Sequence, residues 1–297
     1  MSVLEAIVLG LVQGITEFLP ISSTAHLRIV PELLGWGDPG AAYSAIIQLG
    51  TVFAVILFFA KDLLGLARAF FAGLAARKPF GTPEARLAWF VIVGTLPAVI
   101  AGLAFKKQIE TTLRSLQVVA ASMVVLAIFL FLAEKLASHR RSMGQMTWTD
   151  SVVIGCCQAL ALVPGSSRSG TTLTGGLALG LKREDAARYS FLLSIPINTA
   201  AAVLELKHSL HDPHRVSAGM MVLGVVVAFG SGLTVIAGLL RFLRTRTTLV
   251  FVVYRVVLGL FLLFMLQTGR LHAFSGLHNI TPEHAPERIP VEKRVND

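Results

Sequence analysis

Apolar segments of two lengths alternate along the chain, and their order predicts its architecture. Two runs at 4–19 and 23–36, separated by Pro20, are each shorter than the roughly 20 residues that cross a bilayer. Three longer runs follow, at 41–60, 86–105 and 117–134. The order then repeats: short runs at 151–163 and from the following turn to Leu181 flank Pro164, and long runs occupy 187–206, 217–240 and 248–267.

Two short helices joined by a polar turn are typical of a re-entrant hairpin, with one kinked span as the alternative. A hairpin plus three spans occurs twice, and because three is odd the second copy must be inverted in the membrane. We therefore predict an all-α polytopic membrane protein, an inverted-topology repeat of two re-entrant helical hairpins plus six transmembrane helices. Residues 1–267 form a single domain, with repeats at about 1–136 and 149–267, and 268–297 form a polar tail. The connection at 61–85 is expected to hold an interfacial amphipathic helix.

Composition supports the membrane class and excludes a nucleic-acid binder. Hydrophobic residues make up 54% of the chain and charged residues 14%, and the mean hydropathy is +0.72. The net charge of +9 is spread over short loops, which suits an anionic membrane surface rather than a nucleic-acid face. Loops predicted on one side carry fourteen Lys and Arg residues against five on the other. The richer side is assigned to the cytoplasm, so the first hairpin opens outward.

Hydroxyl groups cluster at the two turns. They come from Ser22, Ser23, Thr24, Ser166, Ser167, Ser169, Thr171 and Thr172. Gly165 and Gly170 are expected to let the backbone approach a ligand, and Arg168 offers a planar fork for phosphate oxygens. Because each turn precedes a helix start, both positive helix ends favour an anion. The turns together predict a phosphate site.

Glu17 and His26 supply groups beyond those needed to bind an anion. A carboxylate can bind a hard cation or take a proton, and an imidazole titrates near neutral pH. Each also has a structural interpretation, since Glu17 can simply neutralise Arg168 and His26 can be a core histidine. Arg255, inside the last span, is expected to be a structural partner or a headgroup anchor. The three histidines at 208, 211 and 214 are expected in a solvated loop, because Pro213 disrupts a helix there.

The stretches TEFLPISSTAH and PGSSRSGTT, three spans apart, resemble the two signature motifs of the bacterial undecaprenyl-diphosphate phosphatase family, the bacitracin-resistance type. The resemblance covers nearly the whole chain except the tail. It implies hydrolysis of undecaprenyl diphosphate to undecaprenyl phosphate and inorganic phosphate at the outer face of the bacterial inner membrane. The reaction recycles the lipid carrier of peptidoglycan synthesis and confers bacitracin resistance.

By position, the resemblance implies that Glu17, Ser23, His26 and Arg168 are catalytic. The diphosphate is expected to contact Ser22, Thr24, Gly165, Ser166, Ser167, Ser169, Gly170 and Thr172. The family's divalent cation, Mg²⁺ or Ca²⁺, is expected at Glu17 and Gln13. The implied partners are the polyprenyl diphosphate and the bilayer, and the oligomeric state stays open, with a homodimer as one option.

One departure from the family pattern concerns the cation. Members often carry a second acid four residues before the glutamate, where this chain has Gln13, which brings no charge. The attacking group stays open between a serine, His26 and an activated water. The alternative function is a transporter or flippase that moves polyprenyl phosphate without hydrolysis, since inverted repeats with broken helices are common in transporters.

Overall fold

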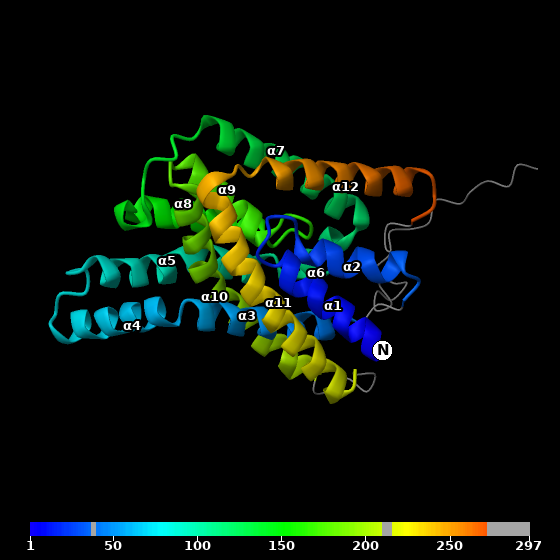
Figure 1. Cartoon of the computed structure of the whole chain (residues 1–297), viewed down its shortest axis with the longest axis horizontal. Coiled ribbons are helices and arrows are strands. Elements are labelled where there is room, and N and C mark those ends of the chain that lie inside the picture. The colour runs from blue at the N-terminus through cyan, green and yellow to red at the C-terminus, as the bar shows by residue number, and fades with distance from the viewer. Residues whose placement is uncertain (37–39, 210–215, 272–297) are drawn as a thin grey trace, which may run out of the picture.

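The computed structural model describes residues 1–36, 40–209 and 216–271, and every regular element within them is helical. These residues form twelve α-helices and two short 3₁₀ helices, η1 (Thr112–Arg114) and η2 (Met143–Gln145). The α-helices are α1 (Val3–Thr16), α2 (Ser23–Leu33), α3 (Gly40–Phe58), α4 (Ala60–Ala75), α5 (Pro83–Ala104), α6 (Lys106–Glu110), α7 (Leu116–Leu136), α8 (Trp148–Leu160), α9 (Arg168–Ala178), α10 (Arg183–Ser209), α11 (Ala218–Thr245) and α12 (Leu249–Gln267) (Figure 1). Of the three histidines expected in a loop, His208 lies instead near the end of α10, and the segment 210–215, which contains the other two, lies outside the described residues, as do residues 272–297 of the predicted tail.

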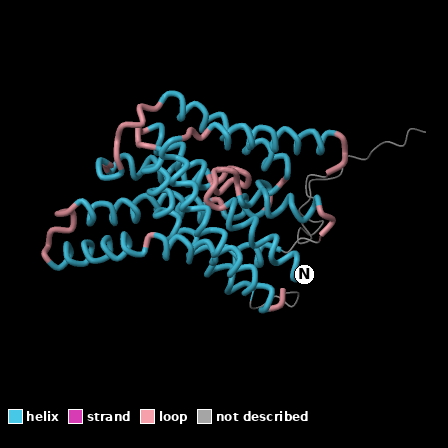
Figure 2. Tube along the Cα trace, viewed as in Figure 1, coloured by secondary structure: helices cyan, strands magenta, loops and turns pink. Residues whose placement is uncertain are grey.

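The two predicted helix pairs are present, and each breaks at its predicted turn. Capping boxes begin the first helix of each pair, at Ser2 and Glu5 for α1 and at Thr147 and Asp150 for α8. The turns that end α1 and α8 lie together in the middle of the molecule, surrounded by helices (Figure 2). The pattern of short apolar runs therefore correctly located the two broken helix pairs, α1–α2 and α8–α9.

Among the described helices, fewer than the six predicted have the length and composition of a membrane span. Within the described residues, four helices are long and apolar enough to cross a membrane: α5, α7, α11 and α12. A fifth is obtained if α3 and α4, which meet at a 74° bend, form one broken span. The helix expected within 61–85 exists as α4, and it packs along α5 (Figure 1). α10 is not among the candidates, and its polar residues Ser190 and Asn198 are buried.

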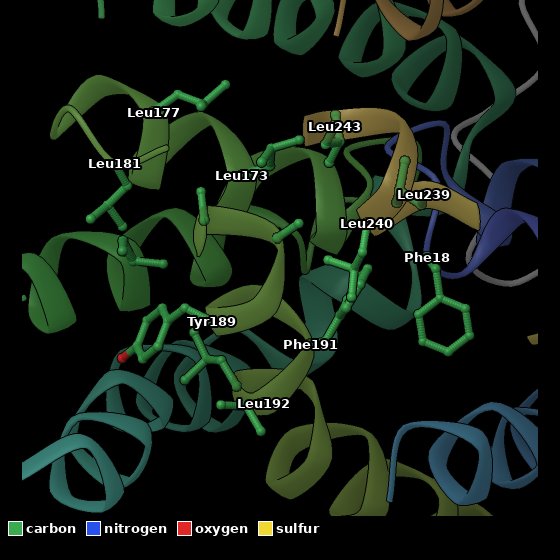
Figure 3. Packing of buried hydrophobic residues seen from close by; sticks show 14 of the residues in the cluster. Phe18, Leu173, Leu177, Leu181, Tyr189, Phe191, Leu192, Leu239, Leu240 and Leu243 are labelled. Atoms are coloured by element: carbon green, nitrogen blue, oxygen red, sulfur yellow. The ribbon is translucent and has the colours of Figure 1, made fainter. Parts of the chain in front are cut away.

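The main hydrophobic core lies behind the turns and holds them in place. It includes leucines of α9 and α11 and aromatic residues of α10 (Figure 3). Phe18, which is fully buried, packs edge-on against Phe191 with ring centroids 5.3 Å apart. Because Phe18 follows Glu17 directly, this contact anchors the backbone that presents the carboxylate.

Candidate active site

Both turns end in the same unusual backbone conformation. Ser22 and Ser167, the N-caps of α2 and α9, have φ angles of 76° and 66°, which residues with a side chain rarely adopt. The side chain of each accepts a hydrogen bond from a backbone N–H in the first turn of its helix, from Ala25 over 3.4 Å and from Gly170 over 3.1 Å. Strained backbone at two matched positions is typical of a site whose geometry the surrounding fold imposes.

Hydroxyl contacts hold each turn and join the two. Ser22 pairs with Thr24 over 3.1 Å, and Ser167 pairs with Ser169 over 3.2 Å. Ser169 also donates to the carbonyl of Leu19 across 2.9 Å, which links the second turn to the first. The two turns therefore form one structural unit, as the sequence predicted.

Glu17 lies at the centre of this unit and is buried. Its Oε1 accepts from Arg168 Nη2 at 3.1 Å and from Asn198 Nδ2 at 2.9 Å. Its Oε2 accepts from Ser23 Oγ at 2.7 Å and from Gln13 Nε2 at 3.2 Å. The carboxylate thus connects both turns with α1 and α10, and it places a hydrogen-bonded acceptor next to the Ser23 hydroxyl.

Arg168 begins α9, and its fork is held by two acceptors. Besides the ion pair with Glu17, its Nη1 donates to the carbonyl of Ser190 over 3.1 Å. Thr172 Oγ1 bonds the carbonyl of Arg168 at 2.7 Å and the Ser190 hydroxyl at 2.6 Å, which fixes α9 against α10. The Nε of Arg168 is buried and has no hydrogen-bond partner among the described residues. A largely buried guanidinium with an unused donor suits an anionic ligand.

A fully buried arginine, Arg255, bonds backbone carbonyls of both turns. Arg255 of α12 is fully buried and donates through Nη2 to the carbonyls of Ser166 at 2.9 Å and Gly165 at 3.3 Å. Its Nη1 reaches the Pro20 carbonyl of the first turn at 3.5 Å. Of the two roles expected for Arg255, the structural one is confirmed.

His26 lies apart from the acid. Its Nδ1 is 2.7 Å from the carbonyl of Ser22, and its Nε2 is 2.6 Å from the Tyr254 hydroxyl. Because a carbonyl can only accept, Nδ1 carries a proton, and in the neutral ring Nε2 accepts from Tyr254. Both ring nitrogens of His26 are therefore occupied, and the imidazole does not contact Glu17.

Two cavities open beside the turns. The inner cavity, of about 180 Å³, is lined by Glu17, Arg168, Asn198 and Gln158 together with hydroxyl-bearing residues of both turns, Ser22, Ser23, Thr24 and Ser167. The outer cavity, of about 440 Å³, shares Ser23 and Thr24 with the inner one and extends to Arg28 and Arg114. The polar inner space adjoins a larger, more apolar outer space, an arrangement that suits a ligand with a charged head and a hydrocarbon tail.

Six of the predicted site residues do not line either cavity: His26, Gly165, Ser166, Ser169, Gly170 and Thr172. The two glycines approach protein atoms instead of a ligand. A Cβ on Gly165, whose φ is 90°, would lie 2.3 Å from the Val119 carbonyl oxygen, and one on Gly170 would lie 2.7 Å from Arg255 Nη1. Both positions therefore need a residue without a Cβ for the second turn to pack, and the approach of a ligand to these glycines stays a prediction.

The comparison with known proteins decides the family. The family model described as "Bacitracin resistance protein BacA" matches residues 6–261. The chain belongs to the BacA family. Relatives named "Undecaprenyl-diphosphatase" include proteins of Myxococcus xanthus, 66% identical over the full length of both chains, and Chlorobaculum tepidum, 51% identical over 91% of this chain and 99% of the relative. A third, from Chloroherpeton thalassium, is 48% identical over 92% of this chain and 100% of its own. As a BacA-family chain it is a multi-pass membrane protein.

The cation expected for a BacA-family protein has few protein ligands here. Among the described residues, no group of three His, Cys, Asp or Glu side chains could hold a metal ion. Glu17 is the one acidic residue lining the two cavities just described, and all four of its hydrogen bonds come from protein donors. The Glu17 carboxylate is therefore occupied by hydrogen-bond donors, and the described residues do not form a metal site by themselves.

Sequence reasoning missed two residues that line the inner cavity, Asn198 and Gln158, and it missed Tyr254, the hydrogen-bond partner of His26. Asn198 and Gln158 were polar positions within otherwise apolar runs, which was a usable signal. Tyr254 gave no signal, because a tyrosine in a span is ordinary at a membrane interface.

Proposed function

We propose that this BacA-family chain hydrolyses undecaprenyl diphosphate, releasing the terminal phosphate and leaving undecaprenyl phosphate in the membrane. The observation that carries the proposal is the contact between Ser23 and Glu17, a hydroxyl 2.7 Å from a buried carboxylate in a cavity that also holds Arg168. A nucleophile paired with a base, beside an anion-binding guanidinium, exceeds what binding alone requires. The names of the relatives support the same substrate.

In the proposed reaction, the diphosphate enters the inner cavity and its terminal phosphoryl group takes Arg168 as its counterion. The starts of α2 and α9, at Ser23 and Arg168, add positive helix ends. Arg168 then neutralises charge on the phosphoryl oxygens, as cationic clamps do in phosphoryl transfer. Its move from carboxylate to phosphate leaves Glu17 able to accept a proton.

Ser23 is the proposed nucleophile. Its Oγ forms a bond to the terminal phosphorus, the bond from phosphorus to the bridging oxygen breaks, and Glu17 takes the hydroxyl proton. Undecaprenyl phosphate leaves with the bridging oxygen. Glu17 passes that proton to the solvent and becomes a base again. Water then attacks the phosphoserine and gives a proton to Glu17, the bond from phosphorus to Ser23 Oγ breaks, and Glu17 returns the proton to Oγ as inorganic phosphate departs. His26 has no step in this scheme, because Ser22 and Tyr254 occupy its ring nitrogens.

The proposed membrane arrangement is the inverted repeat: α1–α2 and α8–α9 as opposed re-entrant hairpins, with six spans in all. The site then opens to the outer side of the bacterial inner membrane, and the basic rim at Arg28 and Arg114 faces the incoming diphosphate. Accessibility labelling of single cysteines tests this orientation. A cysteine at position 2 should react with an impermeant reagent from outside; reaction only from the cytoplasm overturns the topology.

Purified protein in detergent, supplied with farnesyl diphosphate, tests the chemistry. We expect phosphate release by the parent, none by Ser23→Ala, and an acid-stable phosphoserine when the parent is quenched early. If the parent and Ser23→Ala release phosphate equally fast, water rather than Ser23 is the nucleophile. No release by the parent, together with movement of polyprenyl phosphate across vesicles, would establish the transporter alternative instead.

A further inference from the structure

Gln158 is a buried polar residue at the wall of the inner cavity. It lies on α8, only 2% of it is exposed, and neither its Oε1 nor its Nε2 has a hydrogen-bond partner among the described residues. Its side chain lines the inner cavity together with Glu17 and Arg168. Because buried carboxamides are nearly always hydrogen-bonded, an unpaired one at a cavity wall indicates a ligand that completes it.

The repeat explains why Gln158 lacks a partner. Gln13 precedes Ser22 by as many residues as Gln158 precedes Ser167, so the two glutamines hold matching positions before matching turns. Gln13 donates its Nε2 to Glu17, four residues later, over 3.2 Å. Four residues after Gln158 stands Leu162, which offers no acceptor. The second repeat therefore has the amide donor, Gln158, but no carboxylate at the position that corresponds to Glu17.

The groups near Gln158 indicate which ligand supplies the missing anion. The inner cavity also holds the hydroxyl of Ser167 at the start of α9 and the Arg168 guanidinium, whose Nε has no partner in the described part of the chain. These are donors and a positive helix end, so an amide N–H beside them suits an oxygen of an anion. A carboxylate at position 158 would repel the same anion, whereas an amide does not.

We propose that Gln158 binds the terminal phosphoryl group of the diphosphate, with Nε2 donating to a non-bridging oxygen. This inference rests on the proposed function of the site. The phosphoryl oxygen occupies, in the second repeat, the role that the Glu17 carboxylate has in the first. Gln13 therefore orients the acid, and its counterpart Gln158 orients the group that is transferred.

Gln158→Leu tests the assignment, because leucine keeps similar bulk and removes the amide. We expect kcat/KM for farnesyl diphosphate to fall about 10- to 100-fold, the effect of losing one hydrogen bond to a charged group. Gln158→Glu should fall further, since it adds repulsion. Gln117→Leu, the same change at an exposed position on α7, should match the parent.

Thermal unfolding separates substrate binding from a structural role. Without ligand, Gln158→Leu should melt at or above the parent temperature, because an unpaired buried amide is removed. The rise in melting temperature given by the methylene-diphosphonate analogue of farnesyl diphosphate should shrink. Parent-like kcat/KM with an undiminished rise overturns the inference, and so does a lower ligand-free melting temperature with that rise intact. Failure of the parent to release phosphate would instead remove the proposed function, so the two failures are distinguishable.

Discussion

Replacing Glu17 by glutamine tests the centre of the site, because this change keeps the shape and removes the charge. The carboxylate accepts from four donors, and a glutamine has one acceptor oxygen. Gln13 and Asn198 can present their own oxygens to the new amide, and Ser23 can accept from it. Arg168 cannot adapt, because a guanidinium only donates.

The cost therefore falls mainly on Arg168, whose side chain is 11% exposed. Leaving one member of a buried ion pair without its partner typically costs about 3–5 kcal/mol. We expect Glu17→Gln to lower the unfolding free energy by about that amount, whereas Glu84→Gln, at an exposed first-turn acid of α5, should cost no more than about 1 kcal/mol. In the double variant Glu17→Gln/Arg168→Gln the loss should be smaller than the sum of the single losses.

The same reasoning predicts opposite effects on binding and turnover. A bound phosphate restores a counterion to Arg168, so the methylene-diphosphonate analogue of farnesyl diphosphate should raise the melting temperature of Glu17→Gln more than that of the parent. Phosphate release should be lost, because no base remains beside Ser23. The measurements are thermal unfolding in detergent with and without the analogue, and phosphate release from farnesyl diphosphate. A variant as stable as the parent, with parent turnover, would refute the assigned pairing and the assigned base together.

Three further predictions concern single groups. Arg168→Lys keeps the charge but loses the fork, and it should reduce kcat/KM by about 2–3 kcal/mol of transition-state binding, whereas Arg188→Lys, in an exposed pair with Asp62, should be near the parent. Tyr254→Phe should lower the unfolding free energy by about 1 kcal/mol and change kcat/KM less than about threefold, because His26, the partner of its hydroxyl, lines neither cavity. A large fall in turnover would instead indicate that His26 takes part in the reaction. Gln13→Glu places a second acid beside the first, so Mg²⁺ titrations should show a lower half-maximal concentration than for the parent, and an unchanged Mg²⁺ response would speak against a cation there.

The hydropathy pattern predicted the helical class and both broken pairs, because run length and proline position are local properties. It also placed the hydroxyls of Ser22 and Ser167 at helix starts, since the turn residues precede apolar runs. The pairing of Glu17 with Arg168 was only one of the alternatives for the acid, and the structure confirms the contact. Local patterns could supply the helices and their starts because these depend on neighbours in the sequence, whereas the Glu17–Arg168 contact joins residues 151 positions apart.

Other features depend on helices distant in the sequence and could not be derived from spacing. Asn198 reaches Glu17 from α10, and Tyr254 reaches His26 from α12. The periodicity of hydrophobic residues does not indicate which span packs against which turn. The resemblance implied catalytic roles for both His26 and Ser23. In the structure Ser23 contacts the Glu17 carboxylate, whereas His26 contacts Ser22 and Tyr254 instead.

Arg255 has a consequence for how the protein can move. Passage of a lipid by alternating access requires one half of an inverted repeat to rock against the other. In this chain a single guanidinium, rising from α12, is bonded to carbonyls of both halves, at Pro20 and at Gly165 and Ser166. Rocking would break one set of these bonds, and each polar group left unpaired in the interior would cost about 1–3 kcal/mol. Arg255 thus acts as a fixed link between the two halves of the proposed repeat, and such a link suits chemistry at a stationary site better than alternating access.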